Sequence, residues 1–180
     1  TQLRQNHFRL VEVDKELAIS KAIQDQLLPT SARFENDDFR IRGYYRAADR
    51  VSGDWWWYDL KSDRALTLLL GDVTGHGIGA AMVTAKIASI YSVISRKSPT
   101  NASMHELLTD LNESVCAVND AHFAASLFGM RIDPQAGVAE CCFCGCGPVM
   151  FFRHGGSFTS LQRGGRLIGW QPEPMIGHHQ

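Results

Sequence analysis

Two aspartates, Asp54 and Asp72, stand where glycine-containing turns meet apolar strands, a placement that could support metal chemistry. Asp54 opens the aromatic stretch at 55–58, and Asp72 follows the apolar run at 66–70. A short polar turn at 61–64 separates the two stretches and predicts an antiparallel hairpin. Both carboxylates would then arrive side by side at one end of the hairpin. Two carboxylates a few ångströms apart do not both stay charged without a cation, so the pair predicts a site for Mn²⁺ or Mg²⁺.

Asp72 has a second interpretation, in which it only caps the helix that follows. Glycines at 75, 77 and 79 allow the backbone to turn tightly and to approach a ligand closely. Capping explains Asp72 alone, whereas the metal site explains both aspartates, which favours the metal site. A nucleotide-binding loop is disfavoured because the stretch has no Gly-Lys-Ser/Thr signature.

The elements around this hairpin read as strands and amphipathic helices. A helix is expected from Gly79 to about Lys97, with an apolar stripe and with its positive N-terminal end facing the proposed site. Ser103 and Glu106 form a capping box that opens a second helix. From Phe123 onward the pattern predicts strands at 124–132, 138–144, 149–153 and 158–161. Helices packed outside sheets are the expected architecture.

Two segments upstream leave alternatives open. Residues from about 7 to 28 predict a helix with a rough apolar stripe, either docked on its own domain or acting as a coiled-coil linker. Phe39–Ala48 alternates as a half-exposed strand with arginines on one face. That row of arginines could attract a phosphorylated partner, but a solvated strand face is the favoured interpretation.

Composition excludes several classes of protein. The chain has 180 residues, 44% of them hydrophobic, which suits one domain with a sizeable core. Its net charge of −1 argues against a nucleic-acid partner. No apolar run approaches the ~18 residues of a membrane span, and the N-terminus does not have the order of a signal peptide. A cytoplasmic location is expected.

Four of the five cysteines cluster at 141–146. Cys142, Cys144 and Cys146 would share a strand face but repeat every ~6.6 Å, too far apart to converge on one zinc ion without a turn. Buried, reduced thiols are therefore expected, with a metal site as the minor alternative.

Asp54 within Gly-Asp-Trp and Asp72 within Gly-Asp-Val-Thr-Gly-His-Gly resemble two motifs of the SpoIIE/RsbU-type serine phosphatases. These are the bacterial branch of the PP2C-like, metal-dependent protein phosphatases. Gln24–Pro29 is similar to the segment that leads into that domain. The resemblance implies an α+β fold, namely a PP2C-like α-β-β-α sandwich of antiparallel sheets flanked by helices. It divides the chain into an N-terminal helix or linker at 1–29 and a phosphatase domain at 30–180.

The same resemblance assigns roles within a site of two Mn²⁺ or Mg²⁺ ions. Asp54 would bind one ion, Asp72 would bridge both, and the backbone carbonyl of Val73 would be a further ligand. Gly53 and the loop Thr74, Gly75, His76 and Gly77 would surround the phosphate. His76 is interpreted as a loop-structuring residue, because Thr74 occupies the position at which the eukaryotic branch has its histidine.

The resemblance also implies partners. The substrate would be a phosphoserine or phosphothreonine on a regulatory protein, by resemblance an anti-anti-sigma (STAS) protein. An upstream sensory or receiver domain and a homodimer through the N-terminal helix are expected as well.

The match departs from the family pattern in two places. Relatives carry further metal-binding aspartates after the last strands, in a Thr-Asp-Gly motif and a later Asp-Asp motif, and this sequence contains neither there. Cys146 stands where relatives usually have a histidine. We therefore expect a domain truncated at its C-terminus or, as the alternative to an enzyme, a pseudophosphatase adaptor that binds a signalling partner without turnover.

Overall fold

The computed structural model describes residues 2–29, 33–47, 51–60, 64–99, 101–118, 123–153 and 155–179. In chain order its elements are α1 Gln2–Asp25, β1 Arg33–Glu35, β2 Arg40–Arg42, β3 Asp54–Leu60, β4 Leu66–Val73, α2 Gly77–Lys97, α3 Met104–Ala117, β5 Ala125–Asp133, β6 Val138–Cys144, β7 Val149–Arg153, β8 Ser157–Leu161 and β9 Gly177–His179.

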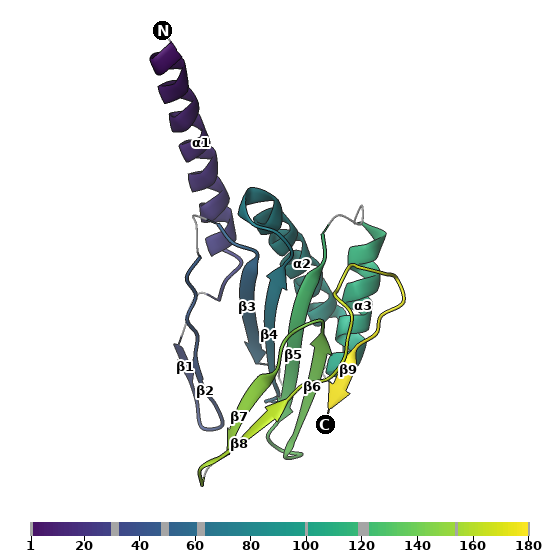
Figure 1. Cartoon of the computed structure of the whole chain (residues 1–180). Helices are drawn as coiled ribbons and strands as arrows, with labels where there is room; N and C mark the ends of the chain where they lie inside the picture. Colours follow the sequence, from purple (N-terminus) through teal and green to yellow (C-terminus); the bar gives the residue numbers. More distant parts are fainter. Residues whose placement is uncertain are drawn as a thin grey trace.

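The centre of the molecule is an antiparallel five-stranded sheet with the order β3-β4-β5-β6-β9 (Figure 1). Its first two strands form the predicted hairpin, although the turn residues 61–63 lie outside the described residues. The run at 66–70, apolar except for Thr67, is extended as predicted; Leu66 and Leu69 are buried, whereas Leu70 is 52% exposed. The α+β fold with antiparallel sheets is therefore confirmed.

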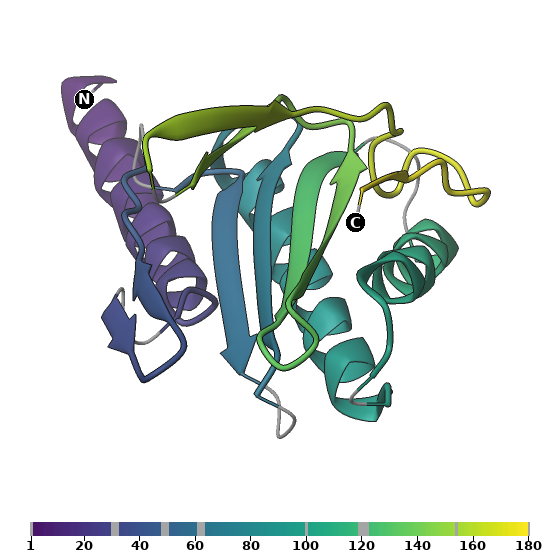
Figure 2. The same cartoon turned by 90° about the horizontal axis from the view of Figure 1, so that it is seen from below.

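Different elements cover the two faces of this sheet (Figures 1 and 2). Helices α2 and α3 contact strands β3 to β6 on one face, where the main core includes Leu69, Ile87, Leu108 and Leu127. The two-stranded sheet β7-β8 packs on the other face, over a smaller cluster around Phe128, Cys141 and Phe143. Alternate residues of one strand therefore enter two different apolar layers.

The helices on the core face follow their sequence patterns. Of the predicted stripe, Ile87 is fully buried, whereas Val83, Ile90 and Ile94 are half-buried. Tyr91, which the stripe did not include, is also fully buried. The capping box of α3 is present, since Ser103 Oγ accepts the N–H of Glu106 at 3.1 Å and Glu106 Oε2 accepts the N–H of Ser103 at 2.9 Å.

Helix α2 differs from the expectation that no apolar run approaches membrane-spanning length. By length and composition it is able to cross a membrane. Because its buried side packs on β3, β4 and α3, it has the contacts of a core helix, a class that passes the same test.

Helix α1 projects away from the sheet (Figure 1). Val13, Ile19 and Ile23 on it are between 50% and 62% exposed, whereas Gln24 near its end is buried. Its contacts include α2. Because Val13, Ile19 and Ile23 stay exposed, this described part of α1 does not dock these side chains on the domain, and the linker interpretation stays a prediction.

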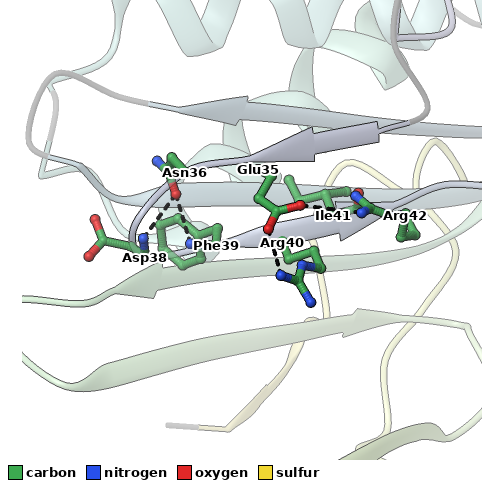
Figure 3. A network of polar contacts seen from close by, with 7 residues as sticks. All are labelled: Glu35, Asn36, Asp38, Phe39, Arg40, Ile41 and Arg42. Atoms are coloured by element: carbon green, nitrogen blue, oxygen red, sulfur yellow. Dashed lines mark hydrogen bonds and ion pairs between the residues drawn. The ribbon is translucent and has the colours of Figure 1, made fainter.

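The strand predicted for Phe39–Ala48 is wrong in its extent, because the strand β2 covers only Arg40–Arg42. It forms a small hairpin with β1 in which the turn is closed by Asn36 Oδ1, which accepts the N–H groups of Asp38 and Phe39 (Figure 3). The alternation of exposed and half-buried residues nevertheless continues to Ala47.

The arginines of β2 are exposed and already paired. Glu35 binds Arg40 at 2.5 Å and Arg42 at 3.3 Å (Figure 3). These ion pairs also lower the pKa of Glu35. This arrangement fits the interpretation of a solvated strand face.

The cysteine prediction is confirmed for the three cysteines of strand β6. Cys141, Cys142 and Cys144 are buried and free. Burial raises the pKa of each thiol, which keeps it protonated. Cys146 is free and half-buried.

Candidate metal centre

The hairpin places the two aspartates as their spacing predicts. Asp54 is the cross-strand partner of Asp72, and Ser126 of β5 follows as the next residue across the sheet. Directly opposite residues of antiparallel strands have Cβ atoms about 4.5–5.5 Å apart. Both aspartates are exposed, so a cation and a substrate can reach them from solvent.

The proximity of the two groups affects their ionisation. Partial burial raises the pKa of Asp72, and the negative charge of Asp54 and a hydrogen bond to its side chain raise it further. Because the two carboxylates repel each other, a cation that lies between them would stabilise both in the charged form. The donor set consists of hard oxygens, which fits Mn²⁺ or Mg²⁺.

Asp54 is held in place by its neighbour Ser52. Ser52 Oγ donates to Asp54 Oδ2 at 3.1 Å and accepts the N–H of Asp54 at 3.1 Å. The backbone of Ser52 is in turn bound by the side chain of Gln24, whose Oε1 accepts the N–H at 3.1 Å and whose Nε2 donates to the carbonyl. Helix α1 is thus connected to Asp54 through hydrogen bonds from Gln24 to Ser52 and from Ser52 to Asp54.

The roles of Gln24 and Ser52 are not among the predictions made from the sequence. Gln24 carried a signal, since it is a polar residue in the apolar stripe of a predicted helix, and the structure buries it to 3% exposure. A buried amide requires hydrogen-bond partners, and the Ser52 backbone supplies them.

Gly53 and Val73, both predicted site residues, lie against each other at the end of the hairpin. The Val73 N–H donates to the carbonyl of Gly53 at 3.2 Å. A Cβ on Gly53 would come within 2.6 Å of the Val73 carbonyl oxygen, so only glycine allows this approach. Thr84 Oγ1 of α2 donates to the same Gly53 carbonyl at 2.9 Å. Helix α2 therefore also holds the end of the β3-β4 hairpin in place.

The loop that follows Asp72 is shaped by hydrogen bonds and glycines. Thr74 donates its N–H to the Ala124 carbonyl at 2.8 Å, and its Oγ1 accepts the Ala124 N–H at 3.2 Å. Gly75 and Gly77 have φ angles of 96° and 74°, values that favour glycine.

Helix α2 begins at Gly77 rather than at the predicted Gly79, and its N-cap is His76. The His76 side chain makes no capping bond and is exposed. The alternative in which Asp72 caps this helix is therefore wrong, because another residue occupies the N-cap.

A pocket of about 1060 Å³ lies beside the carboxylates, on the sheet face opposite α2 and α3. Asp54 and Asp72 contribute to its wall, Leu68 and Leu70 to its apolar surface, and β2 and β7 to its sides. The carboxylate pair therefore borders a space of the size of a ligand-binding pocket.

Solved structures share this architecture. The chain matches the SiaA-PP2C domain of Pseudomonas aeruginosa with a TM-score of 0.72 and 16% identity, over 95% of this chain and 68% of that one. It also matches RsbX, solved in complex with magnesium, with a TM-score of 0.63 and 13% identity, over 82% of this chain and 69% of that one. The fold is therefore that of the PP2C-type phosphatases.

The family follows from the sequence. The family model described as Stage II sporulation protein E (SpoIIE) matches residues 62–180, and the chain belongs to this family of PP2C-type serine phosphatase domains. The phosphoserine phosphatase RsbP of Bacillus subtilis is 28% identical over 124 residues, which are 66% of this chain and 29% of that protein. The chain thus spans less than a third of the length of this relative.

Proposed function

We propose that this chain is the catalytic domain of a Mn²⁺- or Mg²⁺-dependent protein serine/threonine phosphatase in a bacterial signalling regulator. The observation that carries the proposal is the cross-strand pair of Asp54 and Asp72 at the end of β3 and β4. Membership of the SpoIIE family and the likeness to a phosphoserine phosphatase support the reaction class. The magnesium in the RsbX structure supports the kind of cation.

The chain's own residues would hold and orient the reactants. Asp54, Asp72 and the carbonyl of Val73 are the proposed ligands of two divalent ions, which when bound supply an activated water and neutralise charge on the phosphoryl oxygens. Ser52 fixes the orientation of Asp54. The loop from Thr74 to Gly77 and the N-terminal N–H groups of α2 would bind phosphate oxygens. No nucleophilic side chain is required, because water is the attacking group.

The substrate is proposed as a phosphoserine or phosphothreonine on a regulatory protein of the anti-anti-sigma (STAS) type. The exposed carboxylates and the adjoining pocket support a macromolecular substrate, because both are reachable from solvent. The proposed setting is cytoplasmic, with residues 1–29 as a linker to an upstream sensory or receiver domain and 30–180 as the phosphatase domain. Exposed apolar side chains on α1 support a homodimer through this helix.

The test is hydrolysis of a phosphoserine-carrying STAS protein with and without Mn²⁺. We expect turnover that requires the ion, that Asp72→Asn reduces by at least about a hundredfold, and that the exposed-site control Asp110→Asn leaves unchanged. Binding of the phosphoprotein without turnover would instead identify the adaptor. Turnover that persists in Asp72→Asn would overturn the proposed site.

A further inference from the structure

A second group of potential metal ligands lies on the opposite side of the central sheet from the pocket, where β6 meets the edge strand β9. Glu140 and Cys142 are two residues apart on β6 and so share one strand face. His178 of β9 is the direct cross-strand partner of Cys142. One donor atom from each of the three side chains lies within 4.8 Å of the other two.

The cluster is organised by hydrogen bonds. Glu140 Oε2 accepts the N–H of Met104 at 2.7 Å and Oε1 accepts the N–H of His105 at 3.2 Å, so this carboxylate binds the N-terminus of α3. His178 Nε2 lies 3.2 Å from Glu140 Oε1. These contacts hold Glu140 and His178 close together before any ion binds.

A fourth donor lies nearby. The ring of His105, at the start of α3, meets the ring of His178 edge to face, with centroids 6.2 Å apart. His105 is exposed, so its side chain has room to change rotamer. The three clustered side chains and the neighbouring His105 therefore come from three elements: β6, β9 and α3.

The chemistry of these donors differs from that of the aspartate pair. Thiolate, imidazole and carboxylate at about 2.0–2.3 Å from one tetrahedral ion are the usual ligands of Zn²⁺. Tetrahedral ligands at those lengths are about 3.5 Å apart, so the donors of Glu140, Cys142 and His178, which lie within 4.8 Å of one another, would need to approach by only about 1 Å. A sulfur ligand selects against Mg²⁺ and Mn²⁺.

The burial of Cys142 is consistent with a protected ligand. Cys142 is fully buried, while the side chains of Glu140 and His178 are 13% and 43% exposed. Solvent therefore reaches the group from the His178 side. Burial and the charge of Glu140 raise the pKa of Cys142 to about 12, so an ion that binds must displace the thiol proton.

We propose that Glu140, Cys142 and His178, with His105 as the fourth ligand, form a binding site for Zn²⁺ or a similar borderline-soft divalent cation. The site is separate from the carboxylate pair. In the strand register, Glu140 lies opposite Arg131 of β5, and Asp72 lies opposite Ser126 of the same strand. These two positions of β5 are five residues apart, or ~17 Å along the strand. An ion there joins the edge strand β9 to β6 and to the start of α3.

The cysteine pattern had not indicated this site. The spacing of Cys142, Cys144 and Cys146 does not allow these three cysteines to converge on one zinc ion without a turn. The structure uses only Cys142 and adds residues that are distant in sequence. His178 arrives through strand pairing, and Glu140 by alternation along β6.

The test is titration of the chain with Co²⁺, a spectroscopic substitute for Zn²⁺, in excess Mg²⁺ so that the aspartate pair is occupied. We expect one equivalent of tightly bound Co²⁺ with a thiolate-to-metal charge-transfer band. Cys142→Ala should remove the band. Cys141→Ala, the matched control, should retain it, because Cys141 faces the opposite layer with Phe128 and Phe143.

A second variant covers the case in which Cys142→Ala fails to fold. His178→Gln changes a half-exposed side chain and should weaken Zn²⁺ binding by at least about tenfold, measured by competition with a chromophoric chelator. The segment that carries β9 should stay docked in this variant, because Asn112 binds the backbone of Gly169 and Gln171 independently.

Three results would overturn the proposal. The first is a Co²⁺ complex without a charge-transfer band. The second is equal loss of the band in Cys141→Ala and Cys142→Ala. The third is Zn²⁺ binding that Asp72→Asn removes and His178→Gln does not, since the ion would then occupy the carboxylate pair.

Discussion

Replacing Asp72 with asparagine should stabilise the metal-free chain and at the same time make it insensitive to Mn²⁺. The pKa of Asp72 is raised in the folded state by partial burial, by the charge of Asp54 and by their hydrogen bond. Ionised Asp72 is therefore less favourable in the folded chain than in the unfolded chain. Asparagine keeps the shape and removes the charge.

The size of the effect follows from the geometry of the pair. Two unit charges about 4–5 Å apart repel by about 1 kcal/mol in a water-like medium, which is the appropriate limit because both aspartates are exposed. For a domain of this length, that is about 2–4 °C in Tm. Mn²⁺ at a hundred times its Kd should stabilise the unmutated chain by about 2.7 kcal/mol. The order of stability should thus reverse when Mn²⁺ is added.

The pH dependence has a definite sign. A raised folded pKa of a carboxyl group means that stability is highest below the ordinary pKa of aspartate and falls as the pH rises through the folded pKa. The advantage of Asp72→Asn should therefore appear near neutral pH and vanish in acid.

The assay is thermal unfolding of both chains and of the control Asp110→Asn, with and without Mn²⁺, at neutral and acid pH. A metal-free Asp72→Asn chain that is less stable than the unmutated chain at neutral pH would refute the proposed repulsion between the two carboxylates. Equal stabilisation of both chains by Mn²⁺ would refute the proposed role of Asp72 as a metal ligand.

Three other substitutions test the support of the site and the fold. Gln24→Leu should lower the free energy of unfolding by about 1–3 kcal/mol, because the Ser52 backbone loses its hydrogen-bond partners. It should also weaken Mn²⁺ binding severalfold in a calorimetric titration. The exposed control Gln26→Leu should have neither effect. Gly53→Ala should cost about 1–3 kcal/mol in urea unfolding, since its Cβ would lie 2.6 Å from a carbonyl oxygen. Gly147→Ala, with nothing within 4 Å of the added Cβ, should stay within about 0.5 kcal/mol. Ser103→Ala should destabilise by about 1 kcal/mol through loss of the capping box, and an unchanged urea midpoint would contradict that role.

The centre of the fold could be predicted because its signals are local. The short connection between β3 and β4 determines their register, and equal distances from the turn were enough to place Asp54 opposite Asp72. Ser103 and Glu106 likewise determine the start of α3 by contacts within four residues.

The parts that sequence reasoning missed depend on contacts between distant segments. Strand β9 consists of Gly177–His179, which carries little strand propensity and exists by pairing with β6. The strand predicted up to Ala48 ends at Arg42, and a side chain at Gly43 would collide with Trp56. Neither effect can be inferred from local periodicity.

In the candidate site, too, local features could be predicted from the sequence and contacts between distant segments could not. The spacing indicated the two aspartates and the glycines near them. The hydrogen bonds of Gln24 and Thr84 to the backbone of Ser52 and Gly53 come instead from two helices that are distant in sequence. Both are buried polar side chains on helices, and the tertiary structure decides which backbone group each one binds.

The most direct test of the central claim is to locate the ion. Crystals of the chain grown with Mn²⁺ should give an anomalous difference peak between the carboxylates of Asp54 and Asp72, beside the carbonyl of Val73, and crystals of Asp72→Asn should not. A peak that remains in the mutant, or Mn²⁺ found only elsewhere on the chain, would contradict the claim that this pair is the metal centre.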